Sequence, residues 1–212
     1  MTPMPKALIF DCDGTLVLTG DLHFDAFTEA FARQGAALDR GFYHARGGLA
    51  RQGLISEWVA ETGAGLDVAR AVQDSIDAAA RLARAGQCAP NPPVAALARA
   101  WGARPSAVAS NGEAVVVEAI LGGAGLRDLF DTVVTLCDVP APKPDPAMFL
   151  LAAARLGTAP ADCLVLEDSA QGMEAARRAG IPALDVREAP ALAAVAALTQ
   201  RLAAATPALP RL

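Results

Sequence analysis

The sequence predicts an α/β protein, with a doubly wound parallel sheet and an all-helical segment inserted near its beginning. Two observations lead to this fold class. Short, nearly all-apolar runs alternate with stretches of helical periodicity, which indicates parallel strands covered by helices on both faces. One long interval, from Leu16 to about Cys88, has helical periodicity only. Right-handed crossovers between the strands then give the doubly wound arrangement.

The expected strands are short apolar runs that end in small or polar residues. They cover residues 7–10, 106–110, 132–136, 163–169 and 182–186. Apolar residues at helical spacing predict the helices of the sheet layer. These helices cover residues 113–121, 146–156, 171–179 and 191–205, and residues 206–212 form a frayed tail.

The interval without strands contains three amphipathic runs, "LHFDAFTEAFARQG", "RQGLISEWVAETG" and "LDVARAVQDSIDAAARLARAG". At roughly 70 residues it has the size of a small domain. We therefore expect residues 17–87 to form a separate helical domain. The core would then consist of residues 1–16 and 88–212.

The composition favours a globular, cytoplasmic protein. The chain has 212 residues, of which 53% are hydrophobic and 19% charged, and its net charge of −5 argues against nucleic acid as a partner. No apolar run is long enough to cross a bilayer, and no secretory signal is visible. The four cysteines are scattered without a C-x-x-C pair, so we expect free thiols rather than zinc or disulfides. We take the protein as a monomer.

Polar residues follow the expected strands, at the edge where ligands bind in an open parallel sheet. The first strand is followed by two aspartates, the second by a serine and an asparagine, the third by a lysine, and the fourth ends in an acidic pair. These residues are Asp11 and Asp13, Ser110 and Asn111, Lys143, and Glu167 and Asp168. Four segments far apart in the chain should therefore meet at one rim.

Four carboxylates at one rim cannot all stay ionised without compensating positive charge. Lys143 alone is not enough, so the sequence implies a divalent cation. The ligands would be oxygen atoms only, without histidine or cysteine nearby. This donor set favours Mg²⁺, a hard ion.

A metal beside a lysine, a hydroxyl group and a helix N-terminus is typical of a phosphate site. Ser110 and the amides around Asn111-Gly112 would bind phosphoryl oxygens, and Lys143 would neutralise charge during transfer. One aspartate of the first pair can attack phosphorus to form an aspartyl-phosphate. The other can act as general acid and then as base. Gly14 permits the tight turn that this requires.

Each motif alone has an ordinary structural alternative. An Asp-Gly pair is a common turn, and Ser110 to Gly112 can simply cap a helix. Lys143 can be a solvated loop charge, and the pair Glu167-Asp168 can complement a helix dipole. Their order and their common position at strand ends favour the functional interpretation.

The motifs "DCDGT", "SN", "KPDP" and "LEDSAQG" resemble those of the haloacid dehalogenase superfamily of phosphatases and phosphomutases. The resemblance covers nearly the whole chain and implies a Rossmann-like core with a helical cap inserted after the first motif. It implies that Asp11 is the nucleophile and Asp13 the acid/base. The implied Mg²⁺ ligands are the Asp11 carboxylate, the Asp13 backbone carbonyl and Asp168, with Glu167 close by. The implied phosphate ligands are Ser110, Asn111 and Lys143.

Longer stretches, such as "KPDPAMFLLAAARLG", resemble the β-phosphoglucomutase-type branch. Residues 101–134 and "PALDVRE" are particularly similar to its small sugar-phosphate phosphatases, such as those of the fructose-1-phosphate type. His23 matches a hinge histidine of that branch, although a satisfied polar residue on a cap helix is the alternative. Arg46, Gly47 and Arg51 fall where relatives have a cap loop that touches the substrate.

The chain departs from the family pattern at one position of the first motif. Relatives commonly have an acidic residue where this chain has Leu18, directly before Thr19. The position lies at the cap hinge, so we expect catalysis to be retained. Cap closure and substrate choice are what the departure would affect.

We therefore expect a Mg²⁺-dependent phosphatase for a small phosphorylated metabolite, a sugar phosphate. The first alternative is a phosphomutase, which differs in whether the cap excludes water from the intermediate. A dehalogenase is disfavoured because it needs neither an acid at Asp13 nor a Mg²⁺ cluster. A non-enzymatic phospho-acceptor domain of the receiver type is a more distant alternative, and the inserted helical segment counts against it.

Overall fold

The computed structural model describes residues 4–47 and 49–205, and the expected tail at 206–212 lies outside them. Five parallel strands form one sheet in the order β5-β4-β1-β6-β7. Their bounds are β1 Ala7–Phe10, β4 Ser106–Ala109, β5 Thr132–Val134, β6 Cys163–Glu167 and β7 Ala183–Asp185. The predicted fold class is confirmed. Because β1 is the central strand, the residues that follow it emerge between the ends of β4 and β6.

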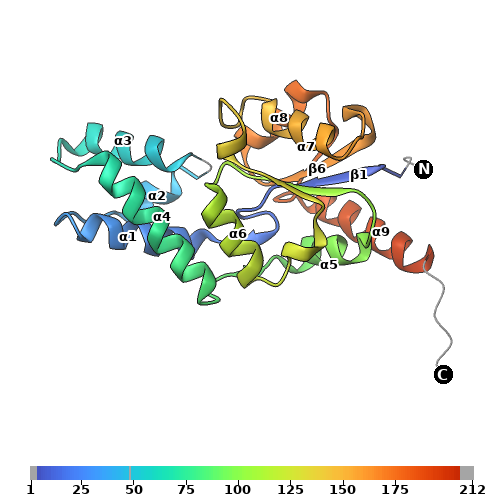
Figure 1. Ribbon diagram of the computed structural model, residues 1–212, viewed down its shortest axis with the longest axis horizontal. Helices are drawn as coiled ribbons and strands as arrows, with labels where there is room; N and C mark the ends of the chain where they lie inside the picture. Colours follow the sequence, from blue (N-terminus) through green and yellow to red (C-terminus); the bar gives the residue numbers. More distant parts are fainter. Residues whose placement is uncertain (1–3, 48, 206–212) are drawn as a thin grey trace.

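Helices cover both faces of this sheet (Figure 1). One face packs against α5 (Pro92–Trp101), α6 (Ala114–Gly123) and α9 (Ala189–Ala205), and the other against α7 (Ala147–Arg155) and α8 (Ala170–Ala179). Successive side chains of a strand point to opposite faces, so Leu8 and Phe10 join the first layer while Ala7 and Ile9 join the second. All four are fully buried, which is why this strand has no polar residue.

The third and fourth strands end earlier than the sequence predicts, because side chains cap the helices that follow. Thr135 begins the short 3₁₀ helix η2 (Leu136–Asp138), and its Oγ1 accepts a hydrogen bond from the amide of Cys137 at 3.3 Å. Ser169 caps α8 in the same way, through a bond of 3.0 Å from the amide of Gly172 to its Oγ. Two further 3₁₀ helices are η1 (Arg127–Leu129) and η3 (Pro160–Asp162).

The inserted segment folds into four helices that lie beyond one end of the sheet (Figure 1). They are α1 Gly20–Ala32, α2 Arg40–His44, α3 Arg51–Thr62 and α4 Val68–Arg84. They share a small core of their own, in which the rings of Phe31 and Trp58 pack edge to face at 4.8 Å between centroids. The domain limits at 17–87 stay a prediction, although all four helices lie between them.

Two short strands connect the helical cap to the core. β2 (Val17–Leu18) enters the cap and pairs antiparallel with β3 (Ala89–Pro90), which leaves it. The amide side chain of Asn91 adds a hydrogen bond of 2.8 Å to the carbonyl oxygen of Thr15. The sequence does not predict this pair, because each strand has two residues and one contains a proline, which normally disfavours a strand.

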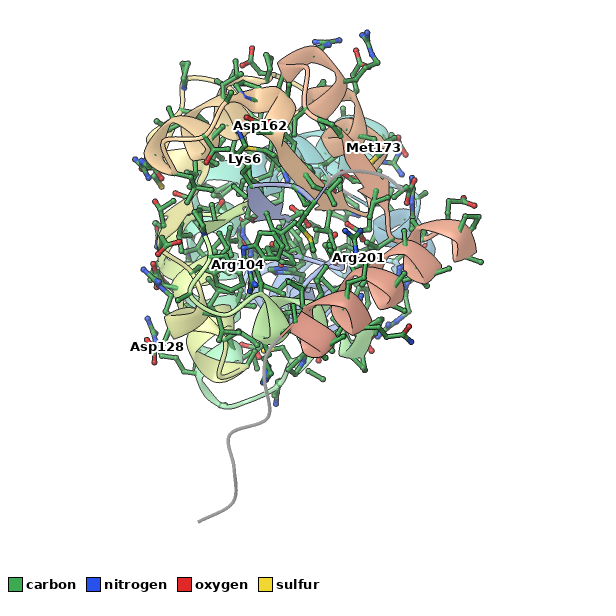
Figure 2. All side chains as sticks on the ribbon, turned by 90° about the vertical axis from the view of Figure 1, so that its right-hand side faces the viewer. Lys6, Arg104, Asp128, Asp162, Met173 and Arg201 are labelled. Carbon is green, nitrogen blue, oxygen red and sulfur yellow. The ribbon has the colours of Figure 1, made fainter. Side chains whose placement is uncertain are left out.

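The opposite end of the sheet carries an exposed ion pair. Lys6 precedes β1, and its Nζ lies 2.9 Å from Oδ2 of Asp162, the residue before β6. Figure 2 looks onto this end of the molecule, with both residues labelled side by side. In the described part of the chain, none of the helices combines the length and the apolar character needed to span a membrane.

The cap packs on the core where helix α4 meets helix α6, and the contact is close enough to exclude a side chain. A Cβ atom placed on Gly123 would lie 2.2 Å from the carbonyl oxygen of Ala83. Backbone cannot yield to such an overlap without a shift of a whole helix. The glycine therefore sets the distance between cap and core at this point.

We expect Gly123→Ala to lower the free energy of unfolding by about 1–3 kcal/mol, because the added methyl group forces the two helices apart. For a chain of this size the melting temperature should fall by several degrees. Gly122→Ala is the matched control, since a Cβ there would meet nothing within 4 Å. In the same helix it should be neutral or stabilising by up to about 1 kcal/mol. Equal melting temperatures for the two variants would contradict the prediction.

Candidate active site

The loop after β1 presents Asp11 and Asp13 at the carboxyl end of the sheet. The amide of Asp11 donates to the carbonyl oxygen of Leu166 at 2.9 Å, which continues the pairing with β6 past the strand. Gly14 then turns the chain with a φ of 82°, a conformation that residues with a Cβ rarely adopt. A Cβ on Gly14 would also lie 2.1 Å from Asp168 Oδ2. Glycine is therefore required at this position on two grounds.

Three carboxylates lie close together at this end of the sheet. Asp11, Glu167 and Asp168 each offer an oxygen atom, and these atoms lie within 4.8 Å of one another. Glu167 is only 1% exposed, and its Oε1 accepts hydrogen bonds from the amides of Asp168 and Ser169 and from the Ser169 hydroxyl. The chain at the start of α8 therefore fixes Glu167 in place. Gly172 leaves room for it, since a Cβ there would lie 1.9 Å from Glu167 Oε2.

Lys143 inserts its ammonium group between two of these carboxylates. Its Nζ lies 2.6 Å from Asp11 Oδ1 and 2.8 Å from Glu167 Oε2, and its side chain is 2% exposed. Burial by itself would lower the pKa of Lys143, but the two carboxylates outweigh it and hold the pKa above its ordinary value. Lys143 is therefore a fixed positive charge in the site.

This one ammonium group does not balance the acidic cluster. Burial raises the pKa of Asp11 well above its ordinary value, and the charge of Glu167 raises it further. Burial and Glu167 likewise raise the pKa of Asp168 to about 6. Burial is the largest cause of both shifts, and the repulsion from Glu167 adds to it, so Lys143 does not fully offset the charge of three close carboxylates. Three close, hard oxygen ligands with a deficit of positive charge fit Mg²⁺.

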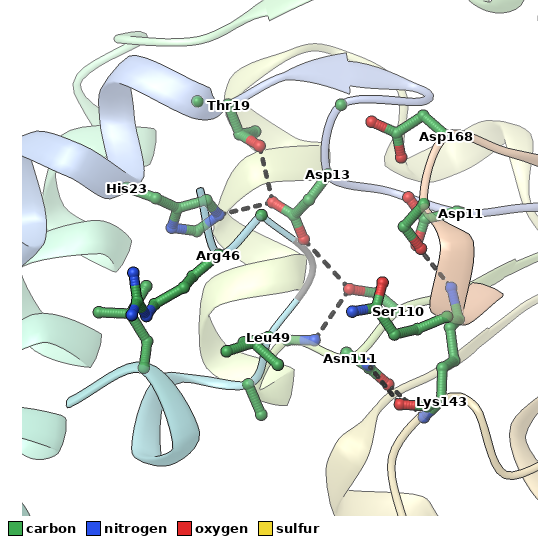
Figure 3. A pocket seen from close by; sticks show the side chains of 18 of the residues that line it. Asp11, Asp13, Thr19, His23, Arg46, Leu49, Ser110, Asn111, Lys143 and Asp168 are labelled. Atoms are coloured by element: carbon green, nitrogen blue, oxygen red, sulfur yellow. Dashed lines mark hydrogen bonds and ion pairs between the residues drawn. The ribbon is translucent and has the colours of Figure 1, made fainter. Parts of the chain in front are cut away.

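Asp13 lies apart from this cluster, and its carboxylate points toward the cap (Figure 3). Its Oδ1 accepts a hydrogen bond from Thr19 at 2.8 Å and lies 2.6 Å from His23 Nε2, while Oδ2 accepts from Ser110 Oγ at 3.2 Å. Burial alone would raise the pKa of Asp13, but the charge and hydrogen bond of His23 and the hydroxyl of Thr19 hold it well below its ordinary value. Asp13 is therefore held as a carboxylate.

Ser110 and Asn111 stand where β4 ends, and they are engaged in different ways. Ser110 Oγ accepts a hydrogen bond from the amide of Gly112 at 2.9 Å and faces Asp13. The side chain of Asn111 instead bridges the backbone of Lys143, accepting from its amide at 2.8 Å and donating to its carbonyl oxygen at 3.4 Å. Asn111 thus ties the lysine loop to the end of β4 (Figure 3).

The cap supplies two arginines to the site, and both have acidic partners. Arg51, at the start of α3, lies 3.0 Å from His23 Nδ1 through Nη2 and donates from Nε to Glu113 Oε2 at 2.8 Å. Glu113 belongs to the core and directly precedes α6. The Arg51–Glu113 pair therefore joins cap and core across the site.

Arg46 is held within the cap. It pairs with Glu57 at 2.8 Å and with Glu61, and its guanidinium lies over the ring of Phe42 at 3.6 Å from the ring centroid. The neighbouring Gly47 lies on the loop that borders the site.

A cavity of about 550 Å³ lies between cap and core and brings these residues together. Every site residue that the sequence predicts lines this cavity, namely Asp11, Asp13, His23, Arg46, Gly47, Arg51, Ser110, Asn111, Lys143, Glu167 and Asp168. The roles assigned to them stay predictions. Sequence reasoning missed Thr19 and Glu113 as site residues. Each of the two is a polar residue close to a motif, and this proximity is the signal that would have indicated a place in the site.

Leu18, where the family resemblance predicts an acid, lies in β2 between core and cap rather than in this cavity's lining. It pairs with Ala89 in the hinge strands and is 51% exposed. It lines a second cleft of about 500 Å³ together with Cys88 and His44. Its effect on cap closure stays a prediction.

Comparison with known proteins identifies the family to which this fold belongs. Residues 5–180 match the family model described as haloacid dehalogenase-like hydrolase. The chain belongs to this family. Fructose-1-phosphate phosphatase YqaB of Escherichia coli is 36% identical over 180 residues, which cover 85% of this chain and 95% of the relative. The chain is accordingly an enzyme, a phosphoric monoester hydrolase of the haloacid dehalogenase type.

Solved structures of the family share the architecture. A crystal structure of CbbY from Rhodobacter sphaeroides in complex with phosphate gives a TM-score of 0.76 at 29% identity, covering 85% of each chain. β-Phosphoglucomutase from Clostridium difficile gives a TM-score of 0.74 at 20% identity, covering 85% of this chain and 84% of its own. At that identity the second likeness shows the fold alone.

Proposed function

We propose that this hydrolase is a Mg²⁺-dependent phosphatase that acts on a small sugar phosphate through an aspartyl-phosphate intermediate. The observation that carries the proposal is the acidic cluster of Asp11, Glu167 and Asp168 beside the ammonium group of Lys143, in the cavity that Asp13 also lines. The carboxylate of Asp13 lies on the cap side of this cavity. The substrate class is supported by the relative named fructose-1-phosphate phosphatase, which the chain matches over nearly its whole length.

In the first step, an oxygen atom of Asp11 attacks phosphorus while the bond to the ester oxygen breaks, and the leaving alkoxide takes a proton from Asp13. Ser110 and Lys143 hold the phosphoryl oxygens, and Asn111 holds the backbone of Lys143 in place. Mg²⁺, bound by Asp11, Asp168 and the backbone carbonyl of Asp13 with Glu167 close by, would neutralise charge on the phosphoryl group.

In the second step, Asp13 takes a proton from water, and the water oxygen attacks phosphorus. The bond between phosphorus and Asp11 breaks, which releases inorganic phosphate and restores both aspartates. Asp13 is held as the carboxylate, which is the form that accepts a proton in this step. His23, 2.6 Å from Asp13, is the neighbouring group with which the proton required in the first step can be shared.

The phosphomutase alternative is less well supported, because the likeness to β-phosphoglucomutase is at the level of the fold. A product assay with β-glucose-1-phosphate distinguishes the two reactions. A phosphatase yields glucose and inorganic phosphate. Glucose-6-phosphate as the main product would contradict the proposal.

We expect the purified protein to release inorganic phosphate from fructose-1-phosphate in the presence of Mg²⁺. A chelator should lower the rate at least about 100-fold, because an ion that offsets several kcal/mol of charge in the transition state is removed. Added Mg²⁺ should restore the rate. A melting curve recorded with chelator is the control that the protein remains folded. Activity that is insensitive to the chelator would contradict the metal requirement.

A further inference from the structure

The positive charges around the cavity are already matched by carboxylates of the protein. Apart from Lys143, the described residues that line the cavity include three arginines, and each has an acidic partner. Arg46 pairs with two glutamates of the cap, and Arg187 donates from Nε to Asp185 at 2.8 Å. Arg51 pairs with Glu113.

The Arg51–Glu113 pair is the most buried of these and the only one of the three that joins cap and core. The exposed fractions are 7% for the Arg51 side chain and 19% for Glu113, so the pair is poorly screened by solvent. At this low exposure the attraction between the guanidinium and the carboxylate is stronger than at the protein surface. Glu113 therefore cancels most of the charge that Arg51 would offer to a bound anion.

One donor of Arg51 remains without a partner. Its Nη1 is buried, and within the described residues no hydrogen-bond acceptor satisfies it. Nη1 has almost no accessible surface, so it offers no free contact to an anion in the cavity.

Resting on the proposed phosphatase function, we infer that Glu113 makes the site selective for sugar monophosphates and against bisphosphates. The phosphoryl group that reacts binds at Asp11 and Lys143, and the rest of the substrate lies toward the cap. A second phosphate there would bring a charge of about −2 next to Glu113 and find no unpaired guanidinium among the three described arginines that line the cavity. Hydroxyl groups of a sugar carry no charge and meet no such repulsion from Glu113.

Fructose-1-phosphate and fructose-1,6-bisphosphate form a matched pair of substrates, because they differ only in the second phosphate. We expect kcat/KM of the wild type to be at least about tenfold higher for the monophosphate. Glu113 would repel the second phosphate of the bisphosphate, and that phosphate would lack a charged hydrogen bond from a free guanidinium. For the bisphosphate, release from position 1 is measured as formation of fructose-6-phosphate.

In the variant Glu113→Gln, the charge of Arg51 is freed for the second phosphate. The preference for the monophosphate should fall at least about tenfold. The added substitution Arg51→Met should abolish the gain for the bisphosphate. Glu118→Gln is the matched control, because Glu118 lies in α6, which Glu113 precedes, and pairs at an exposed position with Arg127. It should leave the ratio unchanged.

The outcomes separate this inference from the proposed function. If the wild type hydrolyses neither sugar, the proposed function is wrong. If it hydrolyses both with equal kcat/KM, the phosphatase assignment stands and the role of Glu113 is overturned. The role of Glu113 is also overturned if the ratio of kcat/KM between the monophosphate and the bisphosphate is the same in Glu113→Gln as in the wild type. The wild-type comparison needs no variant, so a folding defect of Glu113→Gln cannot hide the answer.

Discussion

Replacing Asp11 with asparagine should abolish phosphate release, with kcat at least about 10³-fold below that of the wild type. An amide oxygen is a poor nucleophile and cannot form the proposed acyl phosphate. The remaining groups would still bind the substrate, so the loss should fall on kcat more than on KM. Steady-state kinetics with fructose-1-phosphate measures both.

The same variant should stay folded. The raised pKa of Asp11 shows that its ionised form is unfavourable in the buried cluster, so removal of this charge relieves repulsion with Glu167 and Asp168. Lys143 loses one partner but keeps Glu167 at 2.8 Å. The melting temperature should therefore remain near that of the wild type, which separates loss of chemistry from loss of structure.

Asp128→Asn is a control of the same chemistry at an exposed position remote from the cavity. It should change neither kcat nor the melting temperature. Full activity of Asp11→Asn would be incompatible with the aspartyl-phosphate scheme. An inactive but unfolded variant would instead contradict the account of charge repulsion in the cluster.

The fold and the core of the site could be predicted because they depend on local patterns and on topology. A buried parallel strand is apolar throughout, so β1 and β6 were evident from their residues. The carboxyl ends of such strands meet at one edge, which places Asp11 near Glu167 without any knowledge of packing. Lys143 is farther from the end of its strand, yet its chain also leaves from that edge.

The cap side of the cavity could not be predicted in the same way. Arg51 and Glu113 are 62 residues apart and belong to elements whose contact depends on how the cap docks on the core. Nothing near Glu113 indicates its partner, since an acid before a helix usually complements the helix dipole. Arg46 was expected near substrate, and its pairing with Glu57 and Glu61 depends on the packing of α2 against α3.

We expect Lys143→Met to lose both activity and stability. The ammonium group lies between two carboxylates that are almost completely buried, and removing one partner of a buried ion pair leaves the charges of the others uncompensated. Such changes lower the free energy of unfolding by about 3–5 kcal/mol, or roughly 10 °C in melting temperature for a chain of this length. Phosphate release should fall at least about 100-fold, because the same group holds the phosphoryl oxygens.

Lys6→Met is the matched control. Lys6 also pairs with an aspartate at 2.9 Å, but its side chain is 72% exposed, and the pair lies at the opposite end of the sheet. Solvent screens such a pair, and its loss should lower the free energy of unfolding by less than about 1 kcal/mol. The two variants remove the same side chain, so the difference between them measures burial at Asp11 and Glu167. Similar melting temperatures would contradict the proposed charge balance.

The stability deficit of Lys143→Met should depend on pH, with a definite sign. Burial raises the pKa of Asp11 in the folded protein, so between the ordinary pKa of an aspartate and this raised pKa the folded state binds more protons than the unfolded state. Stability therefore falls as pH rises from the first of these two values to the second. Lysine opposes this shift, and its removal raises the pKa of Asp11 further. Without added divalent ions, the variant should therefore lie farther below the wild type at pH 8 than at pH 5. A deficit that is equal at both pH values would assign the lost stability to packing of the lysine stem instead of its charge.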